Sequence, residues 1–182
     1  MIFWHTAGAI WGARYIFRDP GMDLRWLVFG GLLPDLIDKP LAWFVVPGYQ
    51  TSRLWAHSLL FAALLLAVIV MFTGRGTANR KRFIPVAIGV LMHLVLDVPF
   101  ESETLWWPFL GTDFPPFEFF GFDNLMAYLS RSPWILVQEA LGVGYLVYLW
   151  RRYELSIPAN FTRLRRSGQL GLSVQPHGGN HE

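Results

Sequence analysis

Long apolar stretches separated by short polar breaks dominate the chain. Residues 54–73 contain no aspartate, glutamate, lysine or arginine, and a helix of about twenty residues crosses a hydrocarbon core of about 30 Å. Residues 83–100 and 133–150 carry only isolated ionisable groups. We therefore predict membrane-spanning helices in these three segments.

Two shorter apolar segments precede them. Residues 2–17 and 24–37 flank the polar stretch RDPGMD, which favours a turn, and Asp23 is a candidate N-cap for the second helix. Both helices reach only about 21–24 Å, so they either span a thinned bilayer or form a re-entrant pair. Gly8 and Gly12 have the spacing that lets another helix approach closely. The sequence thus predicts an all-α polytopic membrane bundle of about five helices over residues 1–150.

Composition supports a membrane protein and restricts its chemistry. Of the 182 residues, 53% are hydrophobic and 15% are charged, whereas a soluble domain typically has about 25% charged residues. The chain has no cysteine, so any metal ion is expected to be held by nitrogen and oxygen ligands. The first residues lack a basic region and a cleavage site of small residues, so we expect them to remain in the mature chain.

Basic residues predict the topology. The loop after residue 73 holds Arg75, Arg80, Lys81 and Arg82 without an acidic residue, and short basic loops stay in the cytoplasm. Residues 151–182 are also basic, and we expect them to form a disordered cytoplasmic tail. The chain is then a multi-pass protein of the cytoplasmic (inner) membrane, with the acidic, phenylalanine-rich segment 101–132 on the outer side.

Ionisable residues suited to a metal site lie in or beside these apolar segments. His93 and Asp97 are four residues apart, so on a helix their Cβ atoms lie roughly 5–6 Å apart and one ion can bridge them. The predicted topology brings further candidate ligands to the same outer end: His5, Asp35, Asp38 and His57. Such sets bind first-row divalent metals, so we predict about one to three ions, zinc first and manganese as the alternative. The competing interpretation is a hydrogen-bonded His–Asp pair that only joins helices.

Three more polar residues lie near this predicted site. Arg53 precedes His57 by one helical turn, and a guanidinium can bind a phosphate through two hydrogen bonds. A charged anchor at the membrane interface is the alternative role for Arg53. We expect Ser58 to pack or to support a ligand rather than act as a nucleophile, and Glu139 to form a hydrogen bond between helices.

Three motifs resemble a known family. The segments LLPDLIDKP (32–40), SRLWAHSLL (52–60) and GVLMHLVLD (89–97), the last followed by LWWPFLG (105–111), are similar to the YdjM-like family of membrane-bound metal-dependent hydrolases. With His5, the resemblance covers roughly residues 1–111. That family is in turn similar to the all-helical zinc phospholipase C and nuclease group. The resemblance implies metal-ligand roles for the residues at matching positions: His5, Asp35, Asp38, His57, His93 and Asp97.

Two departures from the family pattern bear on the metal count. Ser52 stands where many relatives have a histidine, and one additional residue separates Asp35 from Asp38. Each departure can change the number of ligands or ions.

The pattern and the resemblance together predict a membrane-bound metal-dependent hydrolase of phosphoesters. A metal-activated water would attack lipid headgroups or lipid-linked phosphates, with Arg53 as the catalytic phosphate-binding residue. The acidic surroundings of the site argue against a nucleic-acid partner, and the sequence indicates no oligomeric state. The alternatives are a metal or proton transporter and a non-enzymatic membrane protein with a structural His/Asp site.

Overall fold

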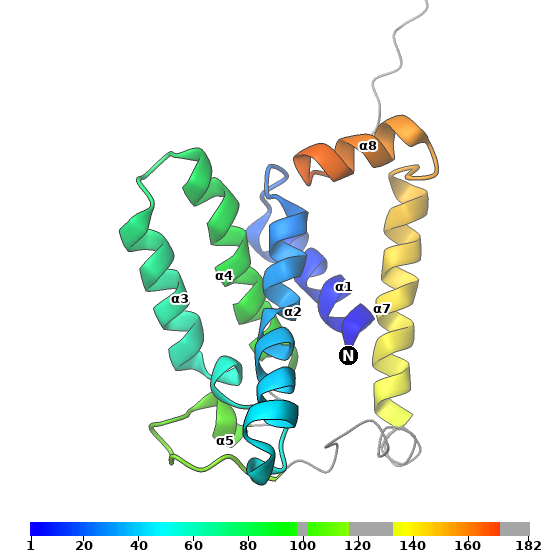
Figure 1. Cartoon of the computed structure of the whole chain (residues 1–182). Helices are drawn as coiled ribbons and strands as arrows, with labels where there is room; N and C mark the ends of the chain where they lie inside the picture. The colour runs from blue at the N-terminus through cyan, green and yellow to red at the C-terminus, as the bar shows by residue number, and fades with distance from the viewer. Residues whose placement is uncertain (98–101, 117–132, 172–182) are drawn as a thin grey trace, which may run out of the picture.

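Helices alone build the part of the chain that the structure describes. The computed structural model describes residues 1–97, 102–116 and 133–171, and every regular element in these ranges is helical. The long helices are α1 (Ile2–Gly12), α2 (Leu24–Pro40), α3 (Leu59–Phe72), α4 (Ala78–Asp97) and α7 (Pro133–Arg152). Two short helices, α5 (Ser102–Leu105) and α8 (Pro158–Ser167), lie at opposite ends of the bundle (Figure 1). The predicted all-helical fold is confirmed.

The first two predicted helices form where the apolar pattern places them. After α1 the chain continues as a π-helical turn, Ala13–Phe17, and after α2 as a second π-helical turn, Leu41–Val45. Asp23 is the N-cap of α2, because its carboxylate accepts the Arg25 backbone N–H at 3.0 Å. The polar turn between the two apolar stretches therefore acts as predicted.

The third predicted helix begins later than its apolar run. Residues 54–58 are not α-helical, and Trp55–His57 form a single 3-10 turn before α3. The carboxylate of Asp38 accepts the backbone N–H groups of Leu54 and Ala56, at 2.8 and 3.1 Å. This segment is thus held by a tertiary contact that the apolar pattern does not reveal. Ser58 then starts α3 by accepting the Phe61 N–H at 3.1 Å.

None of the helices in the described ranges is both long enough and apolar enough to cross a membrane. Helix α3 has 14 residues, which extend about 21 Å, and α4 carries Arg80, Lys81 and Arg82 near its start. The predicted spans over residues 54–73, 83–100 and 133–150 are therefore not confirmed.

Helices α2 and α4 lie at the centre of the bundle in direct backbone contact. A Cβ atom added to Gly30 would lie 2.1 Å from the carbonyl oxygen of Val86, and one added to Gly89 would lie 2.2 Å from that of Leu27. No side chain fits at these distances, so glycine is what permits the approach. The close contact between α2 and α4 therefore fixes the position of the residues at the end of α4.

Helix α1 packs against this pair through the predicted glycine face. A Cβ at Gly8 or Gly12 would meet the side chains of Leu96 and Met92, each at 2.5 Å, so the predicted close approach is confirmed. On its other side α1 contacts α7, where the Phe3 N–H donates to Glu139 Oε2 at 2.9 Å. Glu139 therefore joins two helices, as the sequence predicts.

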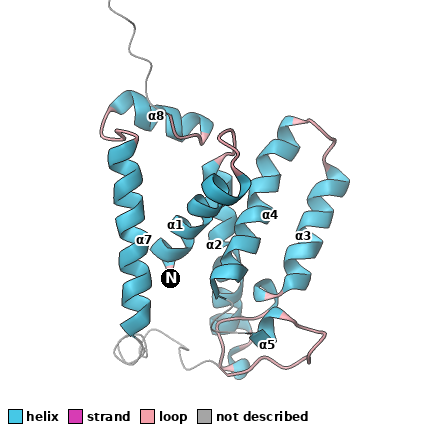
Figure 2. Ribbon diagram, turned by 180° about the vertical axis from the view of Figure 1, so that it is seen from behind, coloured by secondary structure: helices cyan, strands magenta, loops and turns pink. Residues whose placement is uncertain are grey.

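Part of the predicted disordered tail is ordered. Residues 158–167 form α8, and the chain after it docks on the start of α2, where the Leu24 N–H donates to the Gly168 carbonyl at 2.8 Å. Figure 2 shows α8 lying across the end of the bundle beside α7. Because this contact joins segments far apart in sequence, composition alone does not indicate it. Residues 98–101, 117–132 and 172–182 lie outside the described residues, and the predictions made for them stay predictions.

Candidate metal centre

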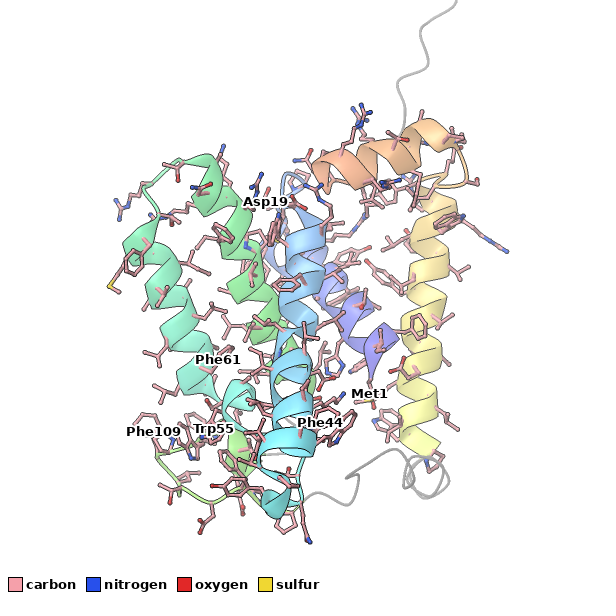
Figure 3. All side chains as sticks on the ribbon, in the orientation of Figure 1. Met1, Asp19, Phe44, Trp55, Phe61 and Phe109 are labelled. Carbon is pink, nitrogen blue, oxygen red and sulfur yellow. The ribbon has the colours of Figure 1, made fainter. Side chains whose placement is uncertain are left out.

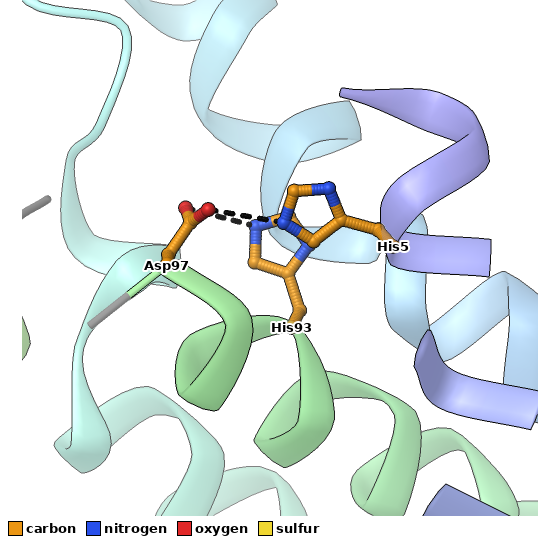
Figure 4. A group of neighbouring side chains, drawn as sticks. All are labelled: His5, His93 and Asp97. Atoms are coloured by element: carbon orange, nitrogen blue, oxygen red, sulfur yellow. Dashed lines mark hydrogen bonds and ion pairs between the residues drawn. The ribbon is translucent and has the colours of Figure 1, made fainter. Parts of the chain in front are cut away.

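Three of the predicted ligands meet where the start of α1 contacts the end of α4. His5 Nε2 lies 3.0 Å from Asp97 Oδ1, and His93 Nε2 lies 3.5 Å from Asp97 Oδ2. The two imidazole rings stack with their centroids 4.1 Å apart. Figure 4 shows Asp97 facing both rings. All three side chains are buried, with His93 fully inaccessible, so the pair predicted on one helix face becomes a three-residue cluster.

A second group extends the cluster toward α2 and α3. His57 Nε2 lies 3.2 Å from His93 Nε2 and 3.4 Å from Asp35 Oδ1. His57 comes from the 3-10 turn before α3, and Asp35 from the second half of α2. Within each of the two groups, His5–His93–Asp97 and Asp35–His57–His93, the candidate ligand atoms lie within 4.8 Å of one another. We call the five residues together the metal centre.

Each histidine of the metal centre has its Nδ1 engaged by an acceptor. His93 Nδ1–H donates to the Gly31 carbonyl at 2.7 Å, His57 Nδ1–H donates to Asp38 Oδ2 at 2.7 Å, and His5 Nδ1–H donates to the Met1 carbonyl. These partners assign the tautomer, since a carbonyl or carboxylate needs a donor. The three Nε2 lone pairs consequently converge on each other and on carboxylate oxygens. A proton or a cation placed among them would stabilise such an arrangement.

Asp38 differs from the other predicted ligands. It is fully buried, and its two oxygens accept the N–H groups of Leu54, Ala56 and His57 as well as His57 Nδ1–H. It belongs to neither group of candidate ligand atoms. In this structure Asp38 fixes the ring of His57, as carboxylates behind metal-bound histidines do, and the ligand role predicted for it stays a prediction.

The geometry limits how ions can share the centre. His93 belongs to both groups, but with Nδ1 bonded to Gly31 it offers one lone pair and so can bind one ion. Asp97 instead directs Oδ1 toward His5 and Oδ2 toward His93, and a carboxylate can bridge two ions through its two oxygens. The set of imidazole nitrogens and carboxylate oxygens suits zinc or another first-row divalent ion.

Positive groups surround the carboxylates. Arg53, 8% exposed, places Nη2 3.2 Å from Asp97 Oδ2, and Lys39 Nζ lies 2.6 Å from Asp35 Oδ2. The N-terminal amine of Met1 lies 4.0 Å from the same Asp35 oxygen. These cations offset the cost of burying the aspartates together. Arg53 thus reaches the metal centre, as the sequence predicts, through an ion pair with a candidate ligand.

Two further residues considered in the sequence, Ser58 and Glu139, support the helical fold. Ser58 caps α3 and donates its hydroxyl to the Trp55 carbonyl at 2.7 Å, which agrees with its predicted supporting role. Glu139 contacts the backbone of α1 and belongs to neither candidate ligand group.

Glycines that position the centre are absent from the residues predicted from the sequence. Gly31 supplies the carbonyl that orients His93, and it reaches that ring because Gly30 and Gly89 let α2 and α4 touch. A signal was available: Gly30 and Gly31 are adjacent in the middle of an apolar segment, where glycine costs helix stability and so points to close packing.

The sequence model of a family described as YdjM inner membrane protein matches residues 3–156, a range that contains the whole metal centre and ends before α8. This confirms the resemblance that the three motifs indicate. No curated protein and no solved structure matches the chain.

Proposed function

We propose that this chain, which belongs to the YdjM inner membrane protein family, is a membrane-bound metal-dependent hydrolase of phosphoesters. The observation that carries the proposal is the convergence of three Nε2 lone pairs and two carboxylates in a buried cluster. A structural His–Asp pair needs one histidine with its proton directed at the carboxylate. Here His5 and His93 donate their Nδ1 protons to backbone carbonyls and His57 donates its proton to Asp38, so no Nδ1 proton is directed at Asp35 or Asp97, which favours a cation between them.

The residues in and around the metal centre have different roles in this proposal. A divalent ion supplies Lewis acidity and lowers the pKa of a water molecule toward neutrality. His5, His93 and Asp97, or Asp35, His57 and His93, would hold the ion, while Asp38 and the Gly31 carbonyl fix the rings of His57 and His93. Arg53 stands beside Asp97, where its guanidinium can contact the phosphoryl oxygens of a substrate.

We further propose that the bundle is embedded in the membrane as a multi-pass protein, with the metal centre on the non-cytoplasmic side. Large apolar side chains are exposed along the outer helices, among them Met71 and Phe72 of α3, 71% and 81% exposed, and Leu141 of α7, 57% exposed. An apolar surface this extensive is what a lipid environment accommodates. The arginine-rich end, opposite the centre, agrees with a cytoplasmic orientation. A centre within a membrane-embedded bundle makes lipid headgroups or lipid-linked phosphates the expected substrates.

Metal content tests the proposal directly. We expect elemental mass spectrometry of the detergent-purified chain to find zinc or manganese bound, and the His93→Ala, Asp97→Ala double variant to lose it. Glu103→Gln, which removes an exposed acidic residue outside the centre, is the matched control and should keep the metal. A wild-type chain that stays metal-free after incubation with both ions would remove the hydrolase proposal and leave a proton-binding or structural cluster.

Substrate class requires a second measurement. The metal-loaded chain should release phosphate or a phosphorylated headgroup from lipids in mixed micelles, and the double variant should not. Cleavage of water-soluble phosphoesters without any cleavage of micellar lipid would contradict the lipid assignment while keeping the hydrolase. Bound metal without either activity would favour a transporter or a structural metal site.

A further inference from the structure

Two cavities meet beneath α8, at the end of the bundle opposite the metal centre. The first, about 320 Å³, is lined by charged and aromatic groups that include Arg14, Arg18, Asp19 and Tyr153. The second, about 420 Å³, is lined almost entirely by apolar side chains, among them Leu146, Leu149 and Leu164. Leu24 and Leu170 line both cavities, so the two adjoin. Figure 3 marks this end of the bundle by Asp19 and the opposite end by Trp55 and Phe109.

The first cavity favours an anion. The guanidinium carbon of Arg14 lies 4.9 Å from the centroid of the Tyr153 ring, and its Nε–H is buried without a hydrogen-bond acceptor in the described part of the chain. Arg18 adds a second guanidinium. The one carboxylate of this lining, Asp19, already accepts the Gly21 N–H at 2.8 Å through Oδ1. This lining has two guanidinium groups and a single carboxylate, which already accepts a hydrogen bond. Such a lining is suited to binding a phosphate group.

The second cavity has the character of a hydrocarbon site. A pocket of about 420 Å³ lies in the size range of ligand pockets. Its roof is fixed in place: the Arg25 Nη1–H donates to the Arg165 carbonyl at 2.7 Å, and the Gln169 side-chain amide donates to the Gly21 carbonyl at 2.9 Å. Helix α8 is therefore tied to the start of α2 above an apolar space.

We propose that the two adjoining cavities bind one anionic phospholipid, with its phosphate beside Arg14 and Arg18 and part of an acyl chain in the apolar cavity. Charge complementarity selects this occupant, because a cationic pocket joined to an apolar one matches the two halves of such a lipid. Membership of an inner membrane protein family places the chain where this lipid is available. The site is separate from the metal centre and does not depend on the proposed hydrolysis.

Lipid retention tests this site. The purified chain is exchanged into a neutral detergent from bilayer discs that hold equal amounts of phosphatidylglycerol and phosphatidylcholine, and retained lipid is counted by native mass spectrometry. We expect the wild type to retain a single phosphatidylglycerol in preference to phosphatidylcholine. The Arg14→Gln, Arg18→Gln double variant should retain about tenfold less phosphatidylglycerol, since it loses the charge-assisted contacts to the phosphate.

Matched variants separate this site from general attraction to a basic surface. Arg75→Gln, Arg166→Gln removes the same charge from exposed positions that line neither cavity, and it should change retention by less than about twofold. Leu164→Trp fills the apolar cavity from the surface helix α8 and should lower retention of lipid in general. Helical circular dichroism and a single elution peak establish that each variant is folded.

Three results would overturn the proposal. An equal loss in the control double variant would reduce the effect to the basic surface. Unchanged retention in Leu164→Trp would remove the acyl-chain cavity from the site. Thermal stabilisation by inorganic phosphate as large as that by phosphatidylglycerol would assign the arginines to a soluble anion.

Discussion

The two ends of the bundle use charge in opposite ways. At the metal centre, His5, His93 and Asp97 are buried and lie within contact distance of one another. At the α8 end, the basic residues are mostly exposed, and acidic residues are few there in the described ranges. The basic residues of this end are Arg14, Arg18, Arg25, Arg75, Arg80, Lys81, Arg82, Arg151, Arg152, Arg163, Arg165 and Arg166.

Burial explains the difference. A charge removed from water costs several kcal/mol unless a partner compensates it, so the carboxylates of the centre are folded against histidines, Arg53 and Lys39. Exposed arginines need no such partners and contribute little to stability. The buried cluster therefore depends on close packing of the helices that carry it. The basic end requires only that arginine and lysine residues lie at that end of the bundle. Variants at the two ends should consequently have very different effects.

The largest effect is expected where α2 touches α4. Gly89→Ala would place a Cβ 2.2 Å from a backbone oxygen, which forces the helices apart and should destabilise the fold by about 3 kcal/mol or more. It should also abolish metal binding, because His93 loses its contact with Gly31. Thermal unfolding in detergent and metal content measure the two effects.

Gly144→Ala is the control for this substitution. No atom lies within 4 Å of a Cβ added there, so alanine should be neutral or stabilise α7 by up to about 1 kcal/mol. Normal stability and metal content in Gly89→Ala would contradict the view that backbone contact positions the metal centre.

A smaller effect is expected from Asp38→Asn. The amide keeps the size of the side chain but can no longer accept hydrogen bonds at both ends, so the His57 ring loses its fixed orientation. Metal affinity should fall by about 10–100-fold, as for other residues that orient a ligand. Competition with a chromophoric chelator measures this affinity. A complete loss of metal, as in the His93→Ala, Asp97→Ala double variant, would instead support Asp38 as a direct ligand.

The smallest effect is expected at the α8 end, from Asp23. Burial raises the pKa of this carboxyl, but hydrogen bonds from the Arg25 side chain and backbone outweigh burial and hold the pKa below its usual value. The Asp23 carboxyl therefore binds its proton less readily in the folded state than in the unfolded state. The contribution of Asp23 to the free energy of unfolding is complete above about pH 4 and is lost as pH falls through the folded pKa.

Unfolding at two pH values tests this contribution. Asp23→Asn should lower stability by less than about 1 kcal/mol at neutral pH, since Arg25 is partly exposed. At acidic pH the difference between wild type and variant should shrink. A difference that grows on acidification would contradict the sign of the pKa shift.

Much of the fold follows from the sequence for a simple reason. Apolar stretches set the positions of α1, α2, α4 and α7, and Asp23 marks a helix start, because these features depend on residues close together in the chain. The starts of α4 and α3 are the exceptions. Helix α4 begins at Ala78, before its predicted segment, and includes Arg80, Lys81 and Arg82. The first predicted turn of α3 is apolar, but Asp38 holds that turn in another conformation.

The candidate site divides in the same way. The sequence determined the residue types of the metal centre and the four-residue spacing of His93 and Asp97, because helical geometry converts spacing into proximity. Only the tertiary structure decided that Asp38 supports His57 while Asp35 faces the centre, that Gly31 orients His93, and that α8 roofs two cavities. These outcomes depend on distances between helices, and those distances are set by packing contacts between residues far apart in the chain.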